Sequence, residues 1–308
     1  YQKQYDAEIA LIETYLKESY INVIYYPGFV EDQDVTIKKI DAGQPSIYSY
    51  LNATTYPKLL VRPVKVHDIE YKLYYLVLRP GVGESPTNVD GVFASYKGTY
   101  LVQSAATATP PLEFTATLFE EVKYPQTIQS LNSVITGWSE TFPQFKTGTS
   151  KINADGTVTH NDFGAGVMFL PSGLGYYNLG ANSIPAYTPL VFSFKLYSIQ
   201  RLDQDNDGIF SYQEQNELDK DGYIYNYLNT TLFPTAPVDG IRYADDFPDK
   251  DGIPNFFDID DDGDNYTTKL EIKDPISGSS IPFALIPDCS GNTTSATRVK
   301  KHLDKNCH

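Results

Sequence analysis

The sequence predicts an α+β fold followed by an acidic extension. Short apolar segments with strand-like alternation recur between residues 71 and 199. One short helical segment interrupts them at about 133–142, and Pro143 ends that helix because proline cannot continue it. Glycines and many acidic residues mark positions 201–275. One small helix among antiparallel strands is typical of the α+β class.

These changes in composition and pattern divide the chain into four regions. We expect an N-terminal helix and extended arm at 1–70, the α+β domain at 71–200, an acidic extension at 201–275 and a C-terminal tail at 276–308. The chain has 308 residues, of which 41% are hydrophobic, and this is enough for a substantial core.

Charge restricts the class of partner. The formal charge is −15, and residues 201–275 account for −13 of it, with 19 acidic against 6 basic residues. Such a chain repels nucleic acid and anionic membranes, whereas acidic residues interleaved with glycine favour cation binding. No apolar run approaches the roughly 20 residues of a membrane-spanning helix, so we expect no span in this chain.

Residues 5–19 predict an amphipathic helix. Its apolar side chains recur at helical spacing on one face, at Ile9, Ile12, Tyr15 and Leu16. Its charged side chains are expected elsewhere on the helix, at Glu8, Glu13 and Lys17. From 21 to 70, short apolar and aromatic runs broken by proline and glycine predict short strands or an ordered extended arm.

The region 71–199 predicts strands around a helix. Segments 71–81, 91–101 and 190–199 are rich in β-branched and aromatic residues and read as strands. The helix at about 133–142 carries Trp138, the single tryptophan of the chain. Taken alone, a lone tryptophan is most often a core residue whose indole N–H finds an acceptor.

Four motifs in this region resemble the FKBP-type peptidyl-prolyl cis-trans isomerases. They are SYKG at 95–98, SVITGW at 133–138, LPSGLGY at 170–176 and SIPAYTPLVFSFKL at 183–196. The resemblance implies a curved antiparallel sheet wrapped around one short helix, and prolyl isomerase activity on proline-containing polypeptide clients.

The resemblance also implies a proline-binding pocket. Trp138 would be its floor, with Val134 and Ile135 leading into it and the Ile135 backbone N–H available to the substrate. Its walls would be Tyr96, Tyr176, Ile184 and Phe192, and the Tyr176 hydroxyl would point to a substrate carbonyl. The family's Phe-Asp pair has its best counterpart in Phe119-Glu120, and Phe114 competes for the same wall position.

The sequence departs from the family pattern at two places. The segment between residues 101 and 131 is longer than in the family and differs from it in sequence. Tyr177 occupies the position where the family has a glycine after the pocket tyrosine. The alternative is therefore a catalytically weak or inactive FKBP-like module that serves binding or adhesion and is stabilised by calcium.

The acidic extension contains a twelve-position calcium loop. Residues 203–214 read DQDNDGIFSYQE, which fits D-x-D-x-D-G with a closing glutamate, as in EF-hand proteins. The expected ligands are Asp203, Asp205, Asp207, the Ile209 carbonyl and Glu214. Gly208 permits the sharp turn, and we expect Phe210 to pack inward.

A second loop is expected at 260–271. Its ligands would be Asp260, Asp262, Asp264, the Tyr266 carbonyl and Glu271, with Asn265 in place of the turn glycine because asparagine tolerates left-handed geometry. Residues 219–222 and 248–264 also resemble thrombospondin type 3 calcium repeats, in which Asp249, Asp251, Asn255 and Asp258 could share a third ion.

We expect this calcium to be structural, because so many carboxylates repel one another without a cation. Cys289 and Cys307 both lie in the tail, and we expect a disulfide between them in an oxidising compartment. Together these features predict a periplasmic, cell-surface or secreted protein of the bacterial envelope. Such extended FKBP-like proteins resemble envelope lipoproteins, so we expect a lipid anchor upstream of residue 1.

Overall fold

The computed structural model of the chain describes residues 1–214, 249, 251 and 253–308, and these form two compact units. Unit 1 comprises Tyr1–Gln200 and unit 2 comprises Arg201–His308. No helix within the described residues has both the length and the apolar character needed to cross a membrane. The expected segment 219–222 lies outside the described residues.

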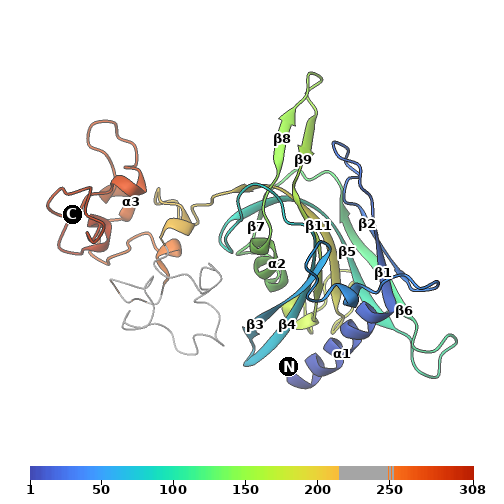
Figure 1. Ribbon diagram of the computed structural model, residues 1–308. Coiled ribbons are helices and arrows are strands. Elements are labelled where there is room, and N and C mark those ends of the chain that lie inside the picture. Colours follow the sequence, from blue (N-terminus) through green and yellow to red (C-terminus); the bar gives the residue numbers. More distant parts are fainter. Residues whose placement is uncertain (215–248, 250, 252) are drawn as a thin grey trace. The chain divides into compact units, whose positions relative to one another are not determined.

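Unit 1 is built on a curled, seven-stranded antiparallel sheet (Figure 1). Its strands are β3 (Lys58–Val66), β4 (Ile69–Arg79), β10 (Gly164–Leu170), β11 (Leu190–Gln200), β5 (Gly91–Gln103) and β6 (Phe114–Val122), in that spatial order, with β7 (Gln129–Ser130) paired to β5. The expected arm at 1–70 therefore contributes a strand to the sheet, and its boundary at residue 70 lies inside β4.

Both faces of the sheet are buried, which follows from the alternation of side chains along each strand. On β4, Leu73 and Tyr75 belong to one apolar cluster, whereas Tyr74 and Leu76 belong to another. The strand is consequently almost continuously apolar, as strands covered on two sides are.

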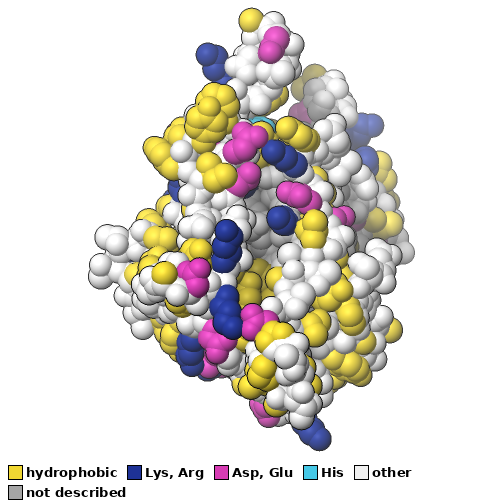
Figure 2. Space-filling view, turned by 90° about the vertical axis from the view of Figure 1, so that its right-hand side faces the viewer, with side chains coloured by type: hydrophobic (Ala, Val, Ile, Leu, Met, Phe, Trp, Pro, Cys, Tyr) yellow, Lys and Arg dark blue, Asp and Glu magenta, His cyan; other side chains and the backbone are white. Residues whose placement is uncertain are grey.

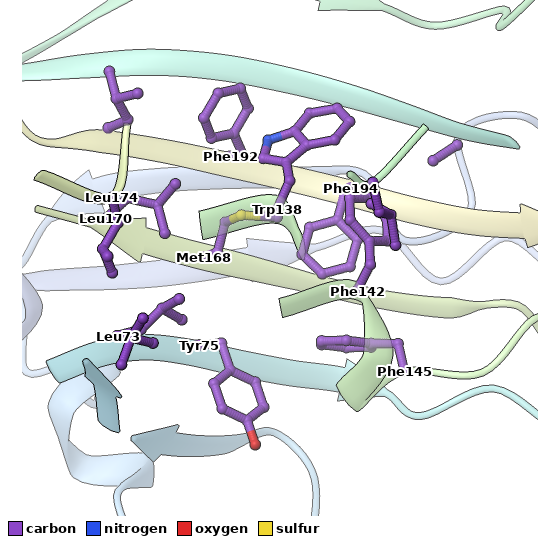
Figure 3. Packing of buried hydrophobic residues seen from close by; sticks show 14 of the residues in the cluster. Leu73, Tyr75, Trp138, Phe142, Phe145, Met168, Leu170, Leu174, Phe192 and Phe194 are labelled. Atoms are coloured by element: carbon purple, nitrogen blue, oxygen red, sulfur yellow. The ribbon is translucent and has the colours of Figure 1, made fainter. Parts of the chain in front are cut away.

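The first cluster surrounds α2 (Thr136–Thr141), and 3₁₀ helix η2 (Phe142–Gln144) continues it (Figure 3). The expected helix at 133–142 is thus shorter at its start. A Cβ at Gly137 would collide with Leu170 of β10, so glycine lets the helix approach the sheet closely. Arg62 of β3 donates to Glu140 of α2 over 2.7 Å and ties the helix to the edge strand.

The second cluster is covered by α1 (Gln2–Glu18) and by η1 (Ile47–Tyr50). The buried face of α1 is Tyr5, Glu8, Ile12, Tyr15 and Leu16. The expectation that Glu8 lies away from this face was wrong. Its carboxylate is only 4% exposed and accepts hydrogen bonds from the Ser172 N–H over 2.7 Å and from the Ser172 hydroxyl over 2.6 Å, so its charge is compensated.

A hairpin of β1 (Ser19–Val23) and β2 (Val35–Lys39) follows α1. Basic side chains of the sheet bind its connecting loop, with ion pairs from Arg79 to Asp32 and from Lys195 to Asp34. On the face turned to the viewer in Figure 2, basic and acidic side chains intermingle around a hollow. This charge pairing orders the expected extended arm.

A second hairpin, β8 (Thr149–Ile152) and β9 (Val158–Asn161), lies between η2 and β10 in the chain. It projects from the rest of unit 1 (Figure 1). Its paired residues Ile152 and Val158 are exposed.

Unit 2 contains only short helices among its described residues. They are η4 (Ser211–Gln213), η6 (Asn255–Phe257), α3 (Thr268–Glu271), η7 (Phe283–Leu285) and η8 (Lys301–Leu303). Ile209, Ile272 and Ile286 form a small buried cluster. Cys289 and Cys307 form a disulfide with their Cα atoms 5.4 Å apart, which confirms the expected pairing.

Candidate functional site

The residues expected to form a proline pocket come from widely separated parts of unit 1 and meet in one apolar cluster. Trp138, Ile184 and Phe192 are buried members of this cluster. The half-buried members packed against them are Tyr96, Phe119, Val134, Ile135 and Tyr176. The cluster therefore has a buried floor and a partly solvent-exposed rim.

Trp138 is the centre of the aromatic packing. Its ring lies edge-on to Tyr96 at 4.8 Å and to Phe192 at 5.5 Å between centroids. Such edge-to-face contacts fix ring orientation and add about 0.5–1.5 kcal/mol each. The indole is 5% exposed, and its Nε1 has no hydrogen-bond acceptor among the described residues. A buried N–H donor without an acceptor in the protein is available to a ligand.

The two phenylalanines that competed for one wall lie on opposite sides of β6. Phe119 packs edge-on to Phe192, with ring centroids 5.5 Å apart. Phe114 packs instead against Tyr15 of α1 on the other side of the sheet. The register between β5 and β6 shifts between Gly98 and Thr99, opposite Phe119. A bulge of this kind re-aims a side chain.

Glu120 contacts the aromatic cluster through a hydrogen bond with Tyr96. The Tyr96 hydroxyl donates to the Glu120 carboxylate, and burial together with this bond raises the pKa of Tyr96. Burial, and then the nearby charge of Glu120, also raises the pKa of Tyr176. Both hydroxyls therefore keep their protons at neutral pH and can donate hydrogen bonds.

The loop before Tyr176 is held by the buried Glu8. The bonds from Ser172 to Glu8 fix η3 (Ser172–Leu174), which directly precedes Gly175 and Tyr176. Tyr177 has φ of 45°, in the left-handed region that favours glycine. The substitution of the family's glycine by Tyr177 therefore keeps a glycine-like backbone. Sequence reasoning missed Glu8 because its partner is 164 residues away.

Val134 and Ile135 lie at the start of α2, where Ile135 is the N-cap residue. N–H groups at this end of a helix have no intrahelical acceptor, so they can bind a ligand carbonyl. The whole cluster is apolar apart from hydroxyl, indole and backbone donors. Such a site can bind an apolar ring and donate hydrogen bonds to peptide carbonyls.

In unit 2, the first expected calcium loop brings its carboxylates together. Oxygens of Asp203, Asp205 and Asp207 lie within 4.8 Å of one another. The Gly208 N–H donates to Asp203 Oδ2 over 3.0 Å, with Gly208 at φ of 108°. Glu214 is 5% exposed, and neither of its carboxylate oxygens has a partner among the described residues.

The second expected loop repeats this geometry. Oxygens of Asp260, Asp262 and Asp264 lie within 4.8 Å of one another. The Asn265 N–H donates to Asp260 Oδ2 over 3.0 Å, and Asn265 has φ of 75°, so it takes the place of the turn glycine. Both Glu271 oxygens lack a partner among the described residues, and Tyr266 is 47% exposed.

Two details of the loops differ from expectation. Phe210 is exposed, and Ile209 packs inward against Ile272 and Ile286 instead. The buried Asp261, which sequence reasoning passed over, joins Asp207 and Glu214 in a further group within 4.8 Å. Burial, with repulsion from neighbouring carboxylates, raises the pKa of Glu214 to about 12 and that of Asp261 to about 9.

Part of the expected third set also clusters. Oxygens of Asp249, Asp251 and Asp258 lie within 4.8 Å of one another. Asn255, the fourth expected ligand, is buried at the start of η6.

Comparison with known proteins found a family model and a curated relative. A family model described as "BamM C-terminal" matches residues 204–296, within unit 2. The FKBP-type peptidyl-prolyl cis-trans isomerase FkpA of Aeromonas hydrophila is 28% identical over 171 residues, which is 56% of this chain and 54% of that protein. The chain thus spans about half the length of this relative.

Two solved structures are also similar to the chain. A peptidyl-prolyl cis-trans isomerase from Pseudomonas syringae pv. tomato is 23% identical, with 45% of this chain and 80% of the other covered, at a TM-score of 0.31. FkpA from Escherichia coli is 25% identical, with 42% and 48% covered, at a TM-score of 0.30.

Unit 1 is a curled antiparallel sheet with few helices, and this arrangement is consistent with an FKBP-like fold. At this modest identity, part of the chain is similar to an FKBP-type peptidyl-prolyl cis-trans isomerase.

Proposed function

We propose that unit 1 is a peptidyl-prolyl cis-trans isomerase and folding chaperone that acts on proline-containing polypeptide clients. The observation that carries this proposal is the meeting of Tyr96, Phe119, Trp138, Tyr176 and Phe192 in one aromatic cluster, from segments widely separated in the chain. The modest similarity to the Aeromonas hydrophila isomerase supports it.

The chemistry requires no nucleophile. Rotation about the peptide bond before proline faces a barrier of roughly 18–20 kcal/mol because the planar amide is stabilised by resonance. The twisted transition state has lost that resonance, and its carbonyl is less polar. An apolar site around Trp138 therefore favours the transition state over the planar ground state, and each ~1.4 kcal/mol of this preference gives about tenfold in rate.

Donors at the rim would orient the substrate. The Tyr176 hydroxyl and the N–H of Ile135, the N-cap residue of α2, would bind the carbonyls that flank the proline. The buried Trp138 Nε1–H would be a third donor at the floor. Holding these carbonyls fixes one side of the bond while the other rotates.

The test is a proline-peptide isomerisation assay with matched variants. We expect Trp138→Ala and Phe119→Leu to lower kcat/KM at least about tenfold, which corresponds to ~1.4 kcal/mol of transition-state stabilisation, and Tyr176→Phe to lower it less. Phe114→Leu is the control, because Phe114 lies on the same strand but faces α1. A wild-type rate equal to the uncatalysed rate would refute the enzyme proposal.

The second candidate is a binding or adhesion module with weak or no turnover. It is favoured by Tyr177, whose bulky side chain replaces the family's glycine next to Tyr176 while keeping a positive φ. Proline-peptide binding that Trp138→Ala abolishes, in a protein without measurable turnover, would decide for this candidate.

We further propose that unit 2 binds structural calcium at two loops. The residues fit this ion, because two loops of the same geometry bring carboxylate oxygens together and calcium takes 6–8 oxygen ligands. Both oxygens of Glu214 and both of Glu271 are buried and have no hydrogen-bond partner among the described residues. Bound calcium would neutralise these carboxylates and hold unit 2 in its folded form. The Asp249 group is a candidate third site.

We place the protein in the bacterial envelope, in the periplasm, at the cell surface or secreted. The disulfide between Cys289 and Cys307 supports an oxidising compartment, and calcium loops of moderate affinity suit calcium-rich surroundings. A lipid anchor upstream of residue 1 belongs to this proposal. Fractionation of the native host, with labelling of lipidated proteins, tests the location and the anchor.

A further inference from the structure

We propose that Asp261, which lies in the second loop, is a ligand of the calcium ion held by the first loop. One cation would then join residues 203–214 to residues 258–271. This inference rests on the proposed calcium binding of unit 2, and it adds a ligand and a coupling between the loops that the twelve-position pattern does not contain.

The geometry of three buried carboxylates carries the proposal. Oxygens of Asp207, Glu214 and Asp261 lie within 4.8 Å of one another. The residues are 2%, 5% and 1% exposed, so water compensates very little of their charge. Both oxygens of Glu214 and both of Asp261 have no hydrogen-bond partner among the described residues. Burying carboxylates this way is strongly unfavourable unless a cation binds them.

In the sequence, Asp261 lies between Asp260 and Asp262, which both belong to the carboxylate group of the second loop. Asp260 and Asp262 cluster with Asp264, whereas Asp261 clusters with Asp207 and Glu214. The Asp261 N–H donates to the buried Thr268 hydroxyl over 3.2 Å, which fixes the backbone at this point. The second loop therefore presents carboxylates to two separate groups.

Other contacts hold the two loops together without an ion. Lys269 of α3 donates to the Asn206 carbonyl over 2.9 Å. Ile209 of the first loop and Ile272, which follows the second loop, pack in one buried cluster. These contacts keep Asp261 beside the first loop, so its carboxylate is prepositioned for the ion.

The added ligand has a consequence for affinity and for folding. Calcium affinity rises with the number of charged ligands and the rigidity of the site. A fifth carboxylate would tighten the first site, and the ion would bind only when both segments are in place. Loss of Asp261 should therefore weaken calcium binding and weaken the link between the loops.

The test is a calorimetric calcium titration of the full chain after chelation. The single variants are Asp261→Asn, Glu214→Gln in the first loop and Glu271→Gln in the second loop. The double variants combine Asp261→Asn with each of the two glutamate substitutions. We expect Asp261→Asn to raise the Kd of one site at least about tenfold, the loss seen even for residues one shell out from a metal. Its effect should be non-additive with Glu214→Gln and additive with Glu271→Gln.

Thermal unfolding gives a second readout with opposite signs. In chelator, Asp261→Asn should raise the melting temperature of unit 2, because it removes a carboxylate whose burial opposes folding. In saturating calcium it should lower that temperature, because a ligand is lost. Asp288→Asn is the control, since Asp288 is a half-buried turn residue of the same unit outside both calcium loops, and asparagine keeps its turn.

The outcomes separate the two proposals. A wild-type chain that binds no calcium overturns both. If the wild-type chain has two sites and Asp261→Asn leaves the titration unchanged, only the role of Asp261 is overturned. The same holds if the effect of Asp261→Asn is non-additive with that of Glu271→Gln instead of Glu214→Gln. A variant that is less stable than wild type under both conditions shows a purely structural residue and also overturns it.

Discussion

The two units of this chain bury different chemistry. Unit 1 covers both faces of its sheet with apolar side chains, and its fully buried residues include Tyr71, Phe142 and Phe169. Among the described residues of unit 2, the buried apolar residues are Phe256, Cys307 and a cluster of three isoleucines, Ile209, Ile272 and Ile286. In the same unit the buried charged residues are Asp207, Glu214, Asp258, Asp261, Asp262 and Glu271.

This difference shows that burial alone does not define what holds a domain together. Apolar burial stabilises unit 1 at roughly 25 cal/mol per Å² removed from water. Unit 2 instead buries groups whose charge opposes folding unless something compensates it. We infer that unit 1 folds on its own core, whereas unit 2 depends on a cation and on its disulfide.

Calcium removal should have the largest effect on stability, and it should affect the unfolding transition of unit 2 but not that of unit 1. At calcium concentrations 100 times the Kd, each site contributes about 2.7 kcal/mol, so two sites contribute about 5 kcal/mol. Scanning calorimetry in chelator should show a lowered transition for unit 2 and an unchanged one for unit 1, with residues 201–275 becoming sensitive to protease. If chelator changes neither the unfolding transitions nor the pattern of protease cleavage, the proposed difference between the two units is wrong.

Loss of the disulfide should have the next largest effect and should also be confined to unit 2. A cross-link that closes a loop of this size contributes about 3 kcal/mol, mainly by restricting the unfolded chain. We expect Cys289→Ser/Cys307→Ser to lose about this much in denaturant unfolding with calcium present. Reduction of the wild-type protein is the matched control. Equal losses in the unit 1 transition would show that the units do not unfold separately.

The sequence predicted local patterns well and long-range contacts poorly. Alternating strands, the helix at Trp138 and the loop turns at Gly208 and Asn265 depend on near neighbours, so they could be recognised. The choice between Phe119 and Phe114 depended on a register shift between strands. The burial of Ile209 in place of Phe210 depended on which side chain reaches Ile272.

Charged residues were the hardest to place, for a physical reason. An acidic side chain is expected on the surface unless a partner compensates it, and the partner is usually distant in sequence. Glu8 is buried because Ser172 donates to it, and Asp261 is buried beside Asp207 and Glu214. Neither partner set is visible in a local window of sequence.

Glu8 gives a third prediction, which tests whether unit 1 depends on apolar contacts alone. Glu8→Gln removes the charge that Ser172 binds and should destabilise unit 1 by about 2 kcal/mol, the scale of hydrogen bonds to a charged group. It should also lower isomerase activity, since η3 precedes Tyr176. Glu18→Gln is the control, because Glu18 is an exposed residue of the same helix. Equal stabilities for both variants would contradict this role.

His302 gives the smallest predicted effect and tests whether apolar burial also matters in unit 2. The side chain is 2% exposed, and burial, followed by the charges of Lys300 and Lys301, lowers its pKa to about 3. Between this value and the ordinary pKa of 6.5, the unfolded chain binds a proton that the folded chain does not. Stability is therefore complete above pH 6.5 and falls with pH below it, by about 1.4 kcal/mol per pH unit.

The measurement compares wild type with His302→Gln by denaturant unfolding at pH 7.5 and 5.5 in saturating calcium. The calcium loops are common to both proteins, so their own titration cancels in the difference. We expect wild type to lose about 1.4 kcal/mol more than the variant over this interval. Equal losses would mean that His302 is protonated, or reached by water, in the folded chain.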